Sequence, residues 1–398
     1  VTAISGDTVS LSDTGVGTFA DKNAGGNKAV TVTGYTLSGN DADNYNIVQP
    51  TGLTATISKA ALTVKANNAS KTYDGLTFSG GNGVSYSDFV NGENASVLGG
   101  ALVYGGTSQD AKNAGTYSLN ASGLNADNYT ISYTDGNLTI DKAQATVTAN
   151  SGQVIYNGQQ QSVSGFTASG LVNDETTSVL SGVSTSGGSG TNAGSYSHSA
   201  SGSDDNYNLT FVDGSLTIDK AQATVTANSG QMVYNGQQQS IAGFTANGLV
   251  NGETTSVLSG VSTSGGSGTN AGSYSHSASG SDDNYNLTFV DGSLTIDKAQ
   301  ATVTANSGQM VYNGQQQSIA GFTASGLVNG ETTSVLSGVS TSGGSGTNAG
   351  SYSHSASGSD ENYDLTFVDG NLTINKAALT VTANNASKTY NGLAFSGG

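Results

Sequence analysis

The chain lacks cysteine and tryptophan, and it has a single proline among its 398 residues. Without cysteine there is no disulfide framework, and no thiol for catalysis or metal binding. No apolar run approaches the length needed to cross a membrane, so no membrane insertion is predicted for this segment. The sequence shows no signal peptide, but it begins and ends within repeat-like sequence, and we expect the array to continue.

Positive charge is also scarce. The 11 basic residues are all lysines, they face 28 acidic residues, and the net charge is −17. Such a surface argues against nucleic acid, whose phosphates require basic side chains, and against docking on anionic lipid. The acidic residues are spread along the chain and not gathered in blocks, so a disordered acidic tail is not expected.

What the chain does have is repetition. The sequence TIDKAQATVTA occurs at 139–149, 217–227 and 295–305, and the related TINKAALTVTA occurs at 373–383. The lysines inside these copies follow one another at steps of 78 residues, which indicates an array of repeated units. The predicted units are the C-terminal part of a module at 1–59, a variant module at 60–142, close repeats at 143–220, 221–298 and 299–376, and the start of a further variant module at 377–398.

No linker separates these units. Apolar and polar residues alternate through 214–219 and again through 221–227, as in two half-buried strands. The last strand of one module is therefore predicted to run almost directly into the first strand of the next, which favours a stiff array.

Within 143–220, Ala143, Ala145, Val147 and Ala149 alternate with polar residues and predict a half-buried strand. Asn157-Gly158 predicts a turn, because Asn-Gly takes positive φ at low cost. The remaining predictions are listed by residue: a strand broken by glycine at 162–172, a helical turn capped by Asn173 at 173–180, a Gly/Ser loop at 184–190 and a strand from Gly194.

The end of the module predicts a hairpin. Asp213-Gly214 is a strong two-residue turn signal between two alternating segments. Pairing across this turn sets Phe211 opposite Leu216 and Leu209 opposite Ile218, with both pairs on one buried face.

Short strands separated by Gly, Asn and Asp turns predict an all-β fold, a tandem array of small Ig-like β-sandwich modules. If the helical turn at Asn173 forms, β-grasp-like modules with one short helix are the alternative. A parallel β-helix does not fit, because no period of about 20 to 30 residues is present.

The histidines His198, His276 and His354 occur once in each close repeat. A role as metal ligand or acid–base group is one interpretation. The variant module has Leu119 at the same place, so we interpret the position as a packing position on the face of Tyr196.

Aspartates recur near the joints, at Asp204, Asp205, Asp213 and Asp219 in the first close repeat. Calcium at the joint is one interpretation, because carboxylate oxygens are its usual ligands. The spacing does not match a calcium loop, and two of the equivalent aspartates are replaced in the last repeat. We therefore interpret them as turn-forming and solvated, and predict no metal ligand or cofactor.

A lysine at every joint raises the alternative of a Lys–Asn isopeptide cross-link, which needs a buried lysine beside an asparagine and a carboxylate. Here the lysine precedes a small alanine at a module edge, so we expect solvent or an ion pair with Asp219. No catalytic residue is predicted, because there is no Ser–His–acid grouping or metal-ligand cluster, and the chain is not expected to be an enzyme.

Several motifs resemble known repeats. KTYDGLTFSGG at 71–81, GFTASGLVNGETTSVLSG at 321–338, NAGSYS and NYNLTFVDGSLTI are similar to MBG-type and YDG-type repeats of bacterial surface adhesins, and 30–60 resembles the closing half of a YDG-type unit. The resemblance covers essentially the whole chain. It implies a large secreted protein of the filamentous-haemagglutinin, two-partner-secretion kind, located outside the cell at the bacterial surface. The close repeats depart from the pattern by Tyr-Asn-Gly in place of Tyr-Asp-Gly.

We therefore expect a structural stalk or spacer of a large adhesin, which projects a distal binding domain and whose partners are neighbouring modules of the same chain. One rival is a multivalent array that grips a host or matrix glycan or protein. Its expected contacts are exposed tyrosines, namely Tyr156, Tyr234, Tyr312 and Tyr390. Another rival is a biofilm element that self-associates through strand edges. Exposure of these tyrosines favours the binding array, and their burial favours the spacer.

Overall fold

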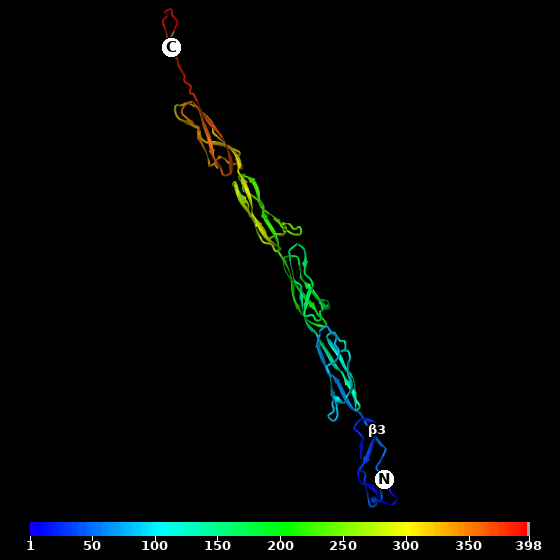
Figure 1. Cartoon of the computed structure of the whole chain (residues 1–398). Helices are drawn as coiled ribbons and strands as arrows, with labels where there is room; N and C mark the ends of the chain where they lie inside the picture. Colours follow the sequence, from blue (N-terminus) through cyan, green and yellow to red (C-terminus); the bar gives the residue numbers. More distant parts are fainter. Residues whose placement is uncertain (396–398) are drawn as a thin grey trace. The chain divides into compact units, whose positions relative to one another are not determined.

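A computed structural model describes residues 1–395 (Figure 1). Contacts within the chain divide it into two compact units. The first comprises Val1–Gly152, Ser162–Ser189 and Tyr196–Leu216, and the second comprises Gln153–Gln161, Gly190–Ser195 and Thr217–Gly398.

Strands make up almost all of the regular structure. Residues 1–149 form β1 (Ser10–Leu11), β2 (Val16–Phe19), β3 (Gly25–Thr33), β4 (Leu37–Ser38), β5 (Leu53–Ile57), β6 (Ala60–Ala66), β7 (Ala69–Thr72), β8 (Val84–Ser87), β9 (Gly99–Gly105), β10 (Gly115–Asn125), β11 (Tyr129–Thr134), β12 (Gly136–Asp141) and β13 (Ala143–Ala149). Residues 152–219 form β14 (Gly152–Ile155), β15 (Gln161–Ser162), β16 (Phe166–Ser169), β17 (Val183–Gly187), β18 (Ser189–Gly190), β19 (Gly194–Gly202), β20 (Tyr207–Val212) and β21 (Gly214–Asp219).

The next two repeats contain the same elements. Residues 221–297 form β22 (Ala221–Ala227), β23 (Gly230–Val233), β24 (Gln239–Ser240), β25 (Phe244–Asn247), β26 (Val261–Gly265), β27 (Ser267–Gly268), β28 (Gly272–Gly280), β29 (Tyr285–Val290) and β30 (Gly292–Asp297). Residues 299–375 form β31 (Ala299–Ala305), β32 (Gly308–Val311), β33 (Gln317–Ser318), β34 (Phe322–Ser325), β35 (Val339–Gly343), β36 (Ser345–Gly346), β37 (Gly350–Gly358), β38 (Tyr363–Val368) and β39 (Gly370–Asn375).

In the first unit, residues 1–59 form the sheet β2-β3-β5 and the pair β1-β4. Apolar and polar residues alternate through 30–39, as in a single strand, but the segment is divided, because β3, labelled in Figure 1, ends at Thr33. Gly34 then takes φ +93, which an L side chain rarely adopts. Residues 60–142 form two sheets, β11-β6-β8 and β7-β12-β10-β9, so the variant module is a sandwich.

In the second unit, residues 221–298 likewise form two main sheets, β25-β22-β29 and β23-β30-β28-β26, with the small pair β24-β27. Residues 299–376 repeat this as β34-β31-β38, β32-β39-β37-β35 and β33-β36. The modules are therefore all-β, Ig-like sandwiches, as predicted.

Alternation along the strands builds the core between the sheets. On β22 the side chains of Ala221, Ala223, Val225 and Ala227 are buried, while the intervening polar side chains point away. Leu294 and Ile296 of β30 are buried in the facing sheet. Small alanines on one side and branched side chains on the other fill a thin core, which follows from the period-2 pattern of the sequence.

The predicted hairpin at Asp213-Gly214 is wrong. Phe211 of β20 pairs in parallel with Val147, and Leu209 pairs with Ala145. The equivalent strands of the next repeat, β29 and β30, belong to different sheets. The turn therefore carries the chain from one sheet to the other, and the two apolar faces meet across the core instead of side by side.

The helical turn is shorter than predicted. Asn173 and Asp174 take positive φ of 51° and 57°, so Asn173 does not cap a helix. A 3₁₀ turn, η3, begins later and spans only Thr177–Val179. Its counterparts are η2 (Ala95–Val97), η4 (Thr255–Val257) and η5 (Thr333–Val335), and η1 (Ala42–Asn44) lies in 1–59. Residues 1–395 contain no longer helix, so the β-grasp alternative lacks its central element.

Two further segments differ from expectation. Residues 184–187, predicted as loop, belong to strand β17, which pairs with β19. Residues 377–395, predicted to start a further module, form no strand, and 396–398 of that prediction lie outside the described residues. In the variant module, β6 is held by β8 and β11, and β7 by β12. The segment 377–395 has no such partners.

Candidate functional site

The most elaborate group of side chains lies where one module meets the next. In the second unit, the hydroxyl of Tyr156 donates a hydrogen bond of 2.5 Å to Oε1 of Glu253, in the following repeat. The hydroxyl of Tyr285 donates to Oε2 of the same carboxylate, also at 2.5 Å. The two rings stand edge to face, with centroids 5.4 Å apart and planes at 82°.

The same arrangement occurs at two other joints. Tyr234 and Tyr363 bind both oxygens of Glu331 in the second unit, each at 2.6 Å. Tyr73 and Tyr207 bind both oxygens of Glu175 in the first unit, again at 2.6 Å. Each joint thus holds one half-buried carboxylate between two phenols, one from each module.

Local sequence explains how the first tyrosine is positioned. Tyr156 follows β14, and its N–H donates to the carbonyl of Asp219 at 2.8 Å. Gly158 then turns the chain with φ 76° and leaves no room for a side chain, because an added Cβ would lie 2.6 Å from Cβ of Asn251. Asn251 in turn donates its amide to the carbonyl of Gly158. The glycine is required both by its conformation and by the close approach of the next module.

A second contact reinforces each joint. Oδ1 of Asn284 accepts from the N–H of Ala193, in the preceding repeat, at 2.8 Å. Nζ of Lys220 donates to the main-chain carbonyl of Asp282 at 2.7 Å. The carboxylate of Asp282 accepts from the N–H groups of Asn284 and Tyr285, which shapes the turn that receives the lysine.

The hydrophobic core also continues across the joint. In the second unit, Tyr234, Leu294 and Ile296 of one repeat form a single buried cluster with Ala299 and Tyr363 of the next. In the first unit the cluster likewise joins Tyr73, Leu138 and Ile140 to Val147 and Tyr207. The modules share buried apolar surface, which resists bending at the joint.

Burial, together with the hydrogen bonds to the carboxylate, raises the pKa of Tyr207, Tyr285 and Tyr363 to about 12. The same causes raise the pKa of Tyr73, Tyr156 and Tyr234 further. Burial alone would raise the pKa of Glu175, but the hydrogen bonds from Tyr207 and Tyr73 and the nearby charge of Lys112 lower it overall. At the Glu175 joint, neutral phenols therefore surround an ionised carboxylate.

The tyrosines predicted as exposed glycan contacts divide into two groups. Tyr156 and Tyr234 are buried in joints. Tyr312 and Tyr390, whose turns face no following module in the described residues, have 42% and 93% of their surface exposed.

The histidines lie at packing positions, as predicted. His198, His276 and His354 are each 1% exposed, and Leu119 is buried at the equivalent place. Nδ1 of each histidine lies 2.7 or 2.8 Å from a main-chain carbonyl, that of Asn150 in the case of His198.

The aspartates are not gathered into a site. Asp204 accepts hydrogen bonds from the N–H groups of Asn206 and Tyr207, and Asp219 accepts from the amide of Gln153. Within residues 1–395 no three His, Asp or Glu side chains come close enough together to hold a metal ion. No helix in that range has the length and apolar character needed to cross a membrane.

Of the two expectations for the joint lysine, solvent exposure or an ion pair with Asp219, the structure shows the first, because Lys220 is exposed. Its ammonium group donates to the carbonyl of Asp282, as Lys142 does to Asp204 and Lys298 to Asp360. These lysines are exposed, so the buried environment that an isopeptide cross-link needs is not present.

The joint glutamates were missed by the sequence reasoning. Glu175, Glu253 and Glu331 each recur in an Asn-x-Glu segment at the same place in the module. The signal was that this acid persists in every copy, together with the recurrent Tyr-x-Gly turn and the Asn-Tyr pair.

Two known domain families match the chain. The MBG domain (YGX type) matches residues 62–139, 145–217, 223–295 and 301–373, and the YDG domain matches residues 1–52. No curated protein matches the chain.

Solved structures that align with the chain include Sidekick-1 immunoglobulin domains 1-5, at 12% identity and TM-score 0.21, over 89% of this chain and 86% of that one. Drosophila N-cadherin EC1-4 aligns at 10% identity and TM-score 0.21, over 80% and 100%. Protocadherin Gamma B2 extracellular cadherin domains 3-6 align at 12% and TM-score 0.24, over 79% and 98%. At these TM-scores the likeness carries no argument about function. The four family matches together cover most of the sequence, and the chain belongs to the MBG domain (YGX type) family, with a YDG domain at residues 1–52.

Proposed function

We propose that this chain is a stalk or spacer segment of a large bacterial cell-surface adhesin, in which modules in series hold a distal binding domain away from the cell. The observation that carries the proposal is the repeated joint, in which the tyrosine of one module is buried against the tyrosine and glutamate of the next. A joint with a shared core, a half-buried carboxylate and main-chain hydrogen bonds resists bending, which a spacer requires. Rigid joints let each added module extend the array, and they add no new binding surface.

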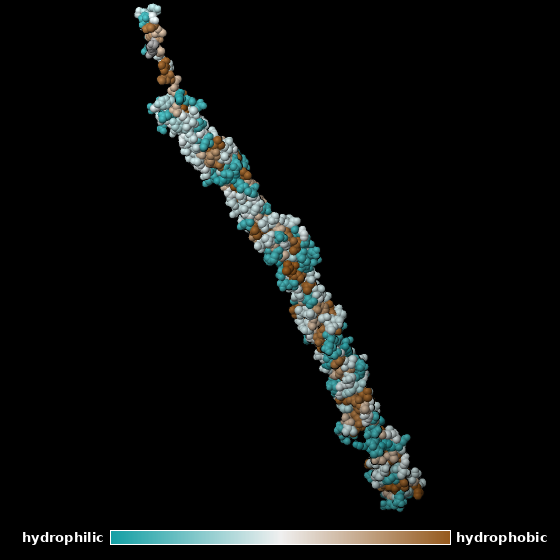
Figure 2. All heavy atoms as spheres, turned by 45° about the horizontal axis from the view of Figure 1, so that its top comes forward, coloured by the Kyte–Doolittle hydropathy of each residue, from teal (hydrophilic) through white to brown (hydrophobic). Residues whose placement is uncertain are grey.

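The burial of Tyr156 and Tyr234 supports the spacer over the multivalent binding array, because these side chains cannot stack on a sugar while they form the joint. On the face that Figure 2 presents, hydrophobic atoms lie in small separated patches among hydrophilic and neutral ones. Small patches of this kind are ordinary for a protein surface and mark no partner site. The matched families are repeat modules, and we propose no catalytic activity.

Small-angle X-ray scattering of the 398-residue chain, in EDTA and then in millimolar Ca²⁺, tests this proposal. The spacer predicts a maximum dimension that corresponds to modules laid end to end, unchanged between the two buffers. A compact particle in both buffers would contradict it. A flexible particle that straightens only with Ca²⁺ would mean that a metal, and not the side-chain joint, supplies the stiffness.

A further inference from the structure

The loop that leads to each joint glutamate contains an asparagine with positive φ. In the last close repeat, Asn329 and Gly330 take φ of 50° and 71°, directly before Glu331. The side chain of Asn329 reaches the preceding module, where its amide donates to the main-chain carbonyl of Gly236 at 3.1 Å. Its Oδ1 accepts from the side-chain amide of Gln237 at 3.4 Å. This asparagine is therefore part of the joint.

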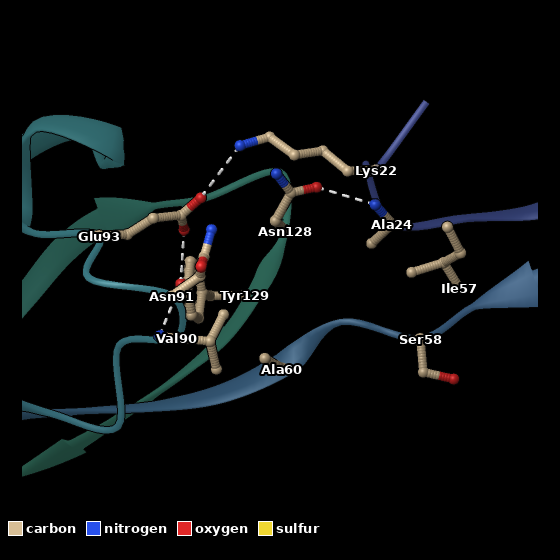
Figure 3. A pocket seen from close by; sticks show the side chains of 10 residues that line it. All are labelled: Lys22, Ala24, Ile57, Ser58, Ala60, Val90, Asn91, Glu93, Asn128 and Tyr129. Atoms are coloured by element: carbon tan, nitrogen blue, oxygen red, sulfur yellow. Dashed lines mark hydrogen bonds and ion pairs between the residues drawn. The ribbon is translucent and has the colours of Figure 1, made fainter. Parts of the chain in front are cut away.

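Four copies of the loop have nearly the same backbone. Figure 3 shows the copy in the variant module, with Asn91 and Glu93 on one loop and the hydroxyl of Tyr129 bound to Glu93. The asparagine has φ between 50° and 53° in each copy, and the next residue has φ between 57° and 75°. That next residue is glycine in three copies, but it is Asp174 in the first close repeat. The backbone conformation therefore does not require glycine, because aspartate also adopts it.

An asparagine followed by glycine can react with its own main chain. The nitrogen of the glycine attacks Cγ of the asparagine, and a new C–N bond closes a five-membered succinimide. The bond from Cγ to the side-chain nitrogen breaks, and ammonia leaves with the proton of the attacking N–H. Water then opens the ring to aspartate or isoaspartate, so one water is consumed for each ammonia released. A Cβ on the attacking residue hinders the approach, and glycine has none.

The surroundings of Gly330 permit this attack. The residue is exposed, and no atom beyond its chain neighbours lies within 4 Å of the place of a Cβ. Within residues 1–395, no carbonyl or side chain accepts a hydrogen bond from its N–H. The Asn235-Gly236 pair across the joint differs, because a Cβ on Gly236 would lie only 2.7 Å from Cβ of Asn329. Close packing holds that turn in place, so we expect Asn235 to keep its amide.

From these observations we propose that Asn329-Gly330 and its equivalent Asn251-Gly252 are sites of spontaneous deamidation, and that the reaction loosens the joint at which it occurs. Both asparagines donate to a glycine carbonyl of the preceding module at 3.1 Å, so both are part of a joint. The first close repeat avoids the reaction, because Asp174 stands in place of the attacking glycine. The modules thus differ in how long their joints stay intact.

Loosening follows from the change of side chain. The amide of Asn329 donates to the carbonyl of Gly236, and an ionised carboxylate in its place has no hydrogen to donate. Nδ2 of Asn329 and Oε1 of Glu331 also lie 3.2 Å from the same point beside Gly236, where a Cβ would be. A second carboxylate there repels Glu331. Isoaspartate adds a methylene group to the main chain and displaces the loop as well. Because the ammonia is lost, the change is permanent.

Isotope labelling of the whole chain tests the proposal. The protein is incubated in mildly alkaline water enriched in oxygen-18, which leaves heavy oxygen at each deamidated residue, and its peptides are sequenced by mass spectrometry. Ser325 in place of Asn247 distinguishes the peptide that contains Asn329 from that of the preceding repeat. We expect label at Asn329 and none at Asn173 or Asn235. No label at Asn329 would overturn the proposal, and so would equal label at either of the other two.

Two reciprocal variants move the reactive pair. Asp174→Gly creates an Asn-Gly pair at the first-unit joint, where the amide of Asn173 donates to the carbonyl of Gly75 at 3.4 Å. Asn173 should then gain label. Gly330→Asp copies the first close repeat, and Asn329 should lose label. Label that fails to follow the glycine in either variant would overturn the proposal.

The effect on the joint is measured with a variant that mimics the product. Asn329→Asp should lower the midpoint of denaturant unfolding. The matched control is Asn235→Asp, which adds the same charge at the same joint, at a turn position where the variant module has Asp74. There Oδ1 of Asn235 accepts from the N–H of Gln237, and a carboxylate also accepts. A shift no larger for Asn329→Asp than for this control would overturn the loosening.

Discussion

Tyr234 and Tyr363 belong to successive repeats, yet their rings stand edge to face with centroids 5.4 Å apart and planes at 82°. Both hydroxyls donate to the single carboxylate of Glu331. This relationship ties the Tyr-Asn-Gly turn of one module to the following module through a group that neither module completes alone. The stability of an array of this kind contains a nearest-neighbour term in addition to the stability of each module.

The first prediction concerns the hydroxyl of Tyr234. Tyr234→Phe keeps the ring but leaves Oε1 of Glu331 without its donor, so the joint should lose about 1.5–3 kcal/mol. The loss is measured from denaturant unfolding curves, fitted with a model in which each module has its own stability and each joint adds an interaction free energy. The control is Tyr312→Phe, at the same place in the following repeat, where the side chain is 42% exposed and no hydrogen bond to its hydroxyl occurs within residues 1–395. That variant should lose less than about 0.5 kcal/mol, and equal losses would contradict the role of the joint.

A second prediction isolates the close approach of the glycine. Gly158 and Gly314 occupy the same turn, with φ of 76° and 80°. Gly158→Ala and Gly314→Ala should share a conformational cost of about 1 kcal/mol. Only Gly158→Ala also places a Cβ 2.6 Å from Asn251, whereas nothing lies within 4 Å at Gly314. The unfolding free energy should therefore fall by at least about 1 kcal/mol more for Gly158→Ala, and the same loss in both variants would mean that the joint tolerates the methyl group.

Alkaline pH should weaken the joints. The pKa of Tyr285 in the folded chain is about 12, above its ordinary value of 10.0, because of burial and the Glu253 hydrogen bond. Its contribution to stability is therefore complete below pH 10 and is lost as pH rises toward 12. Unfolding free energies measured at intervals from pH 7 to 12 should show the loss, and it should be smaller in Tyr285→Phe. A wild-type profile that stays flat to pH 12 would contradict the burial of neutral phenols.

Acid should weaken the first-unit joint for the opposite reason. The folded pKa of Glu175 lies below its ordinary value of 4.5, so its contribution is present above pH 4.5 and is lost as pH falls further. Glu175→Gln should remove this dependence at the cost of stability near neutral pH. The same acid profile in wild type and Glu175→Gln would assign the loss to other carboxylates.

The histidines should be replaceable by leucine. His276 is buried at the position where the variant module has Leu119, and its Nδ1 lies 2.8 Å from the carbonyl oxygen of Asn228. His276→Leu should cost less than about 1.5 kcal/mol, because one neutral hydrogen bond is exchanged for apolar packing. Thermal unfolding checks this prediction, and His276→Asp is the contrasting variant, expected to be much more destabilised because it buries a charge. Equal tolerance of leucine and aspartate would refute the packing interpretation.

Much of the fold follows from local pattern. The alternation through Ala143 to Ala149 correctly gave the buried face, and Gly158 does turn the chain at Tyr-Asn-Gly. The pairing of β20 and β21 was wrong, because two alternating segments look the same whether they pair side by side or face each other across a core. Local alternation fixes which side chains are buried and leaves the choice of partner strand open.

The joint was harder to predict, because its parts are distant in sequence. Tyr156 beside Asn-Gly reads as an exposed aromatic on a turn, and its acceptor Glu253 lies in the following repeat. Neither segment alone indicates burial. The contact between modules is indicated only when the tyrosine, the glutamate and the Asn-Tyr pair are seen to recur together in each copy.

The central claim is that these joints are stiff without metal, and a distance distribution across one joint tests it most directly. Thr245 and Thr323 are exposed, equivalent positions of successive repeats, and Thr245→Cys/Thr323→Cys gives the only two thiols for spin labels. Pulsed electron–electron double resonance in EDTA should give a narrow distribution of distances between the two labels. The distribution should not change with Ca²⁺, and it should broaden when Tyr234→Ala is added. A distribution already broad in the labelled parent, or one that Tyr234→Ala leaves unchanged, would contradict the claim.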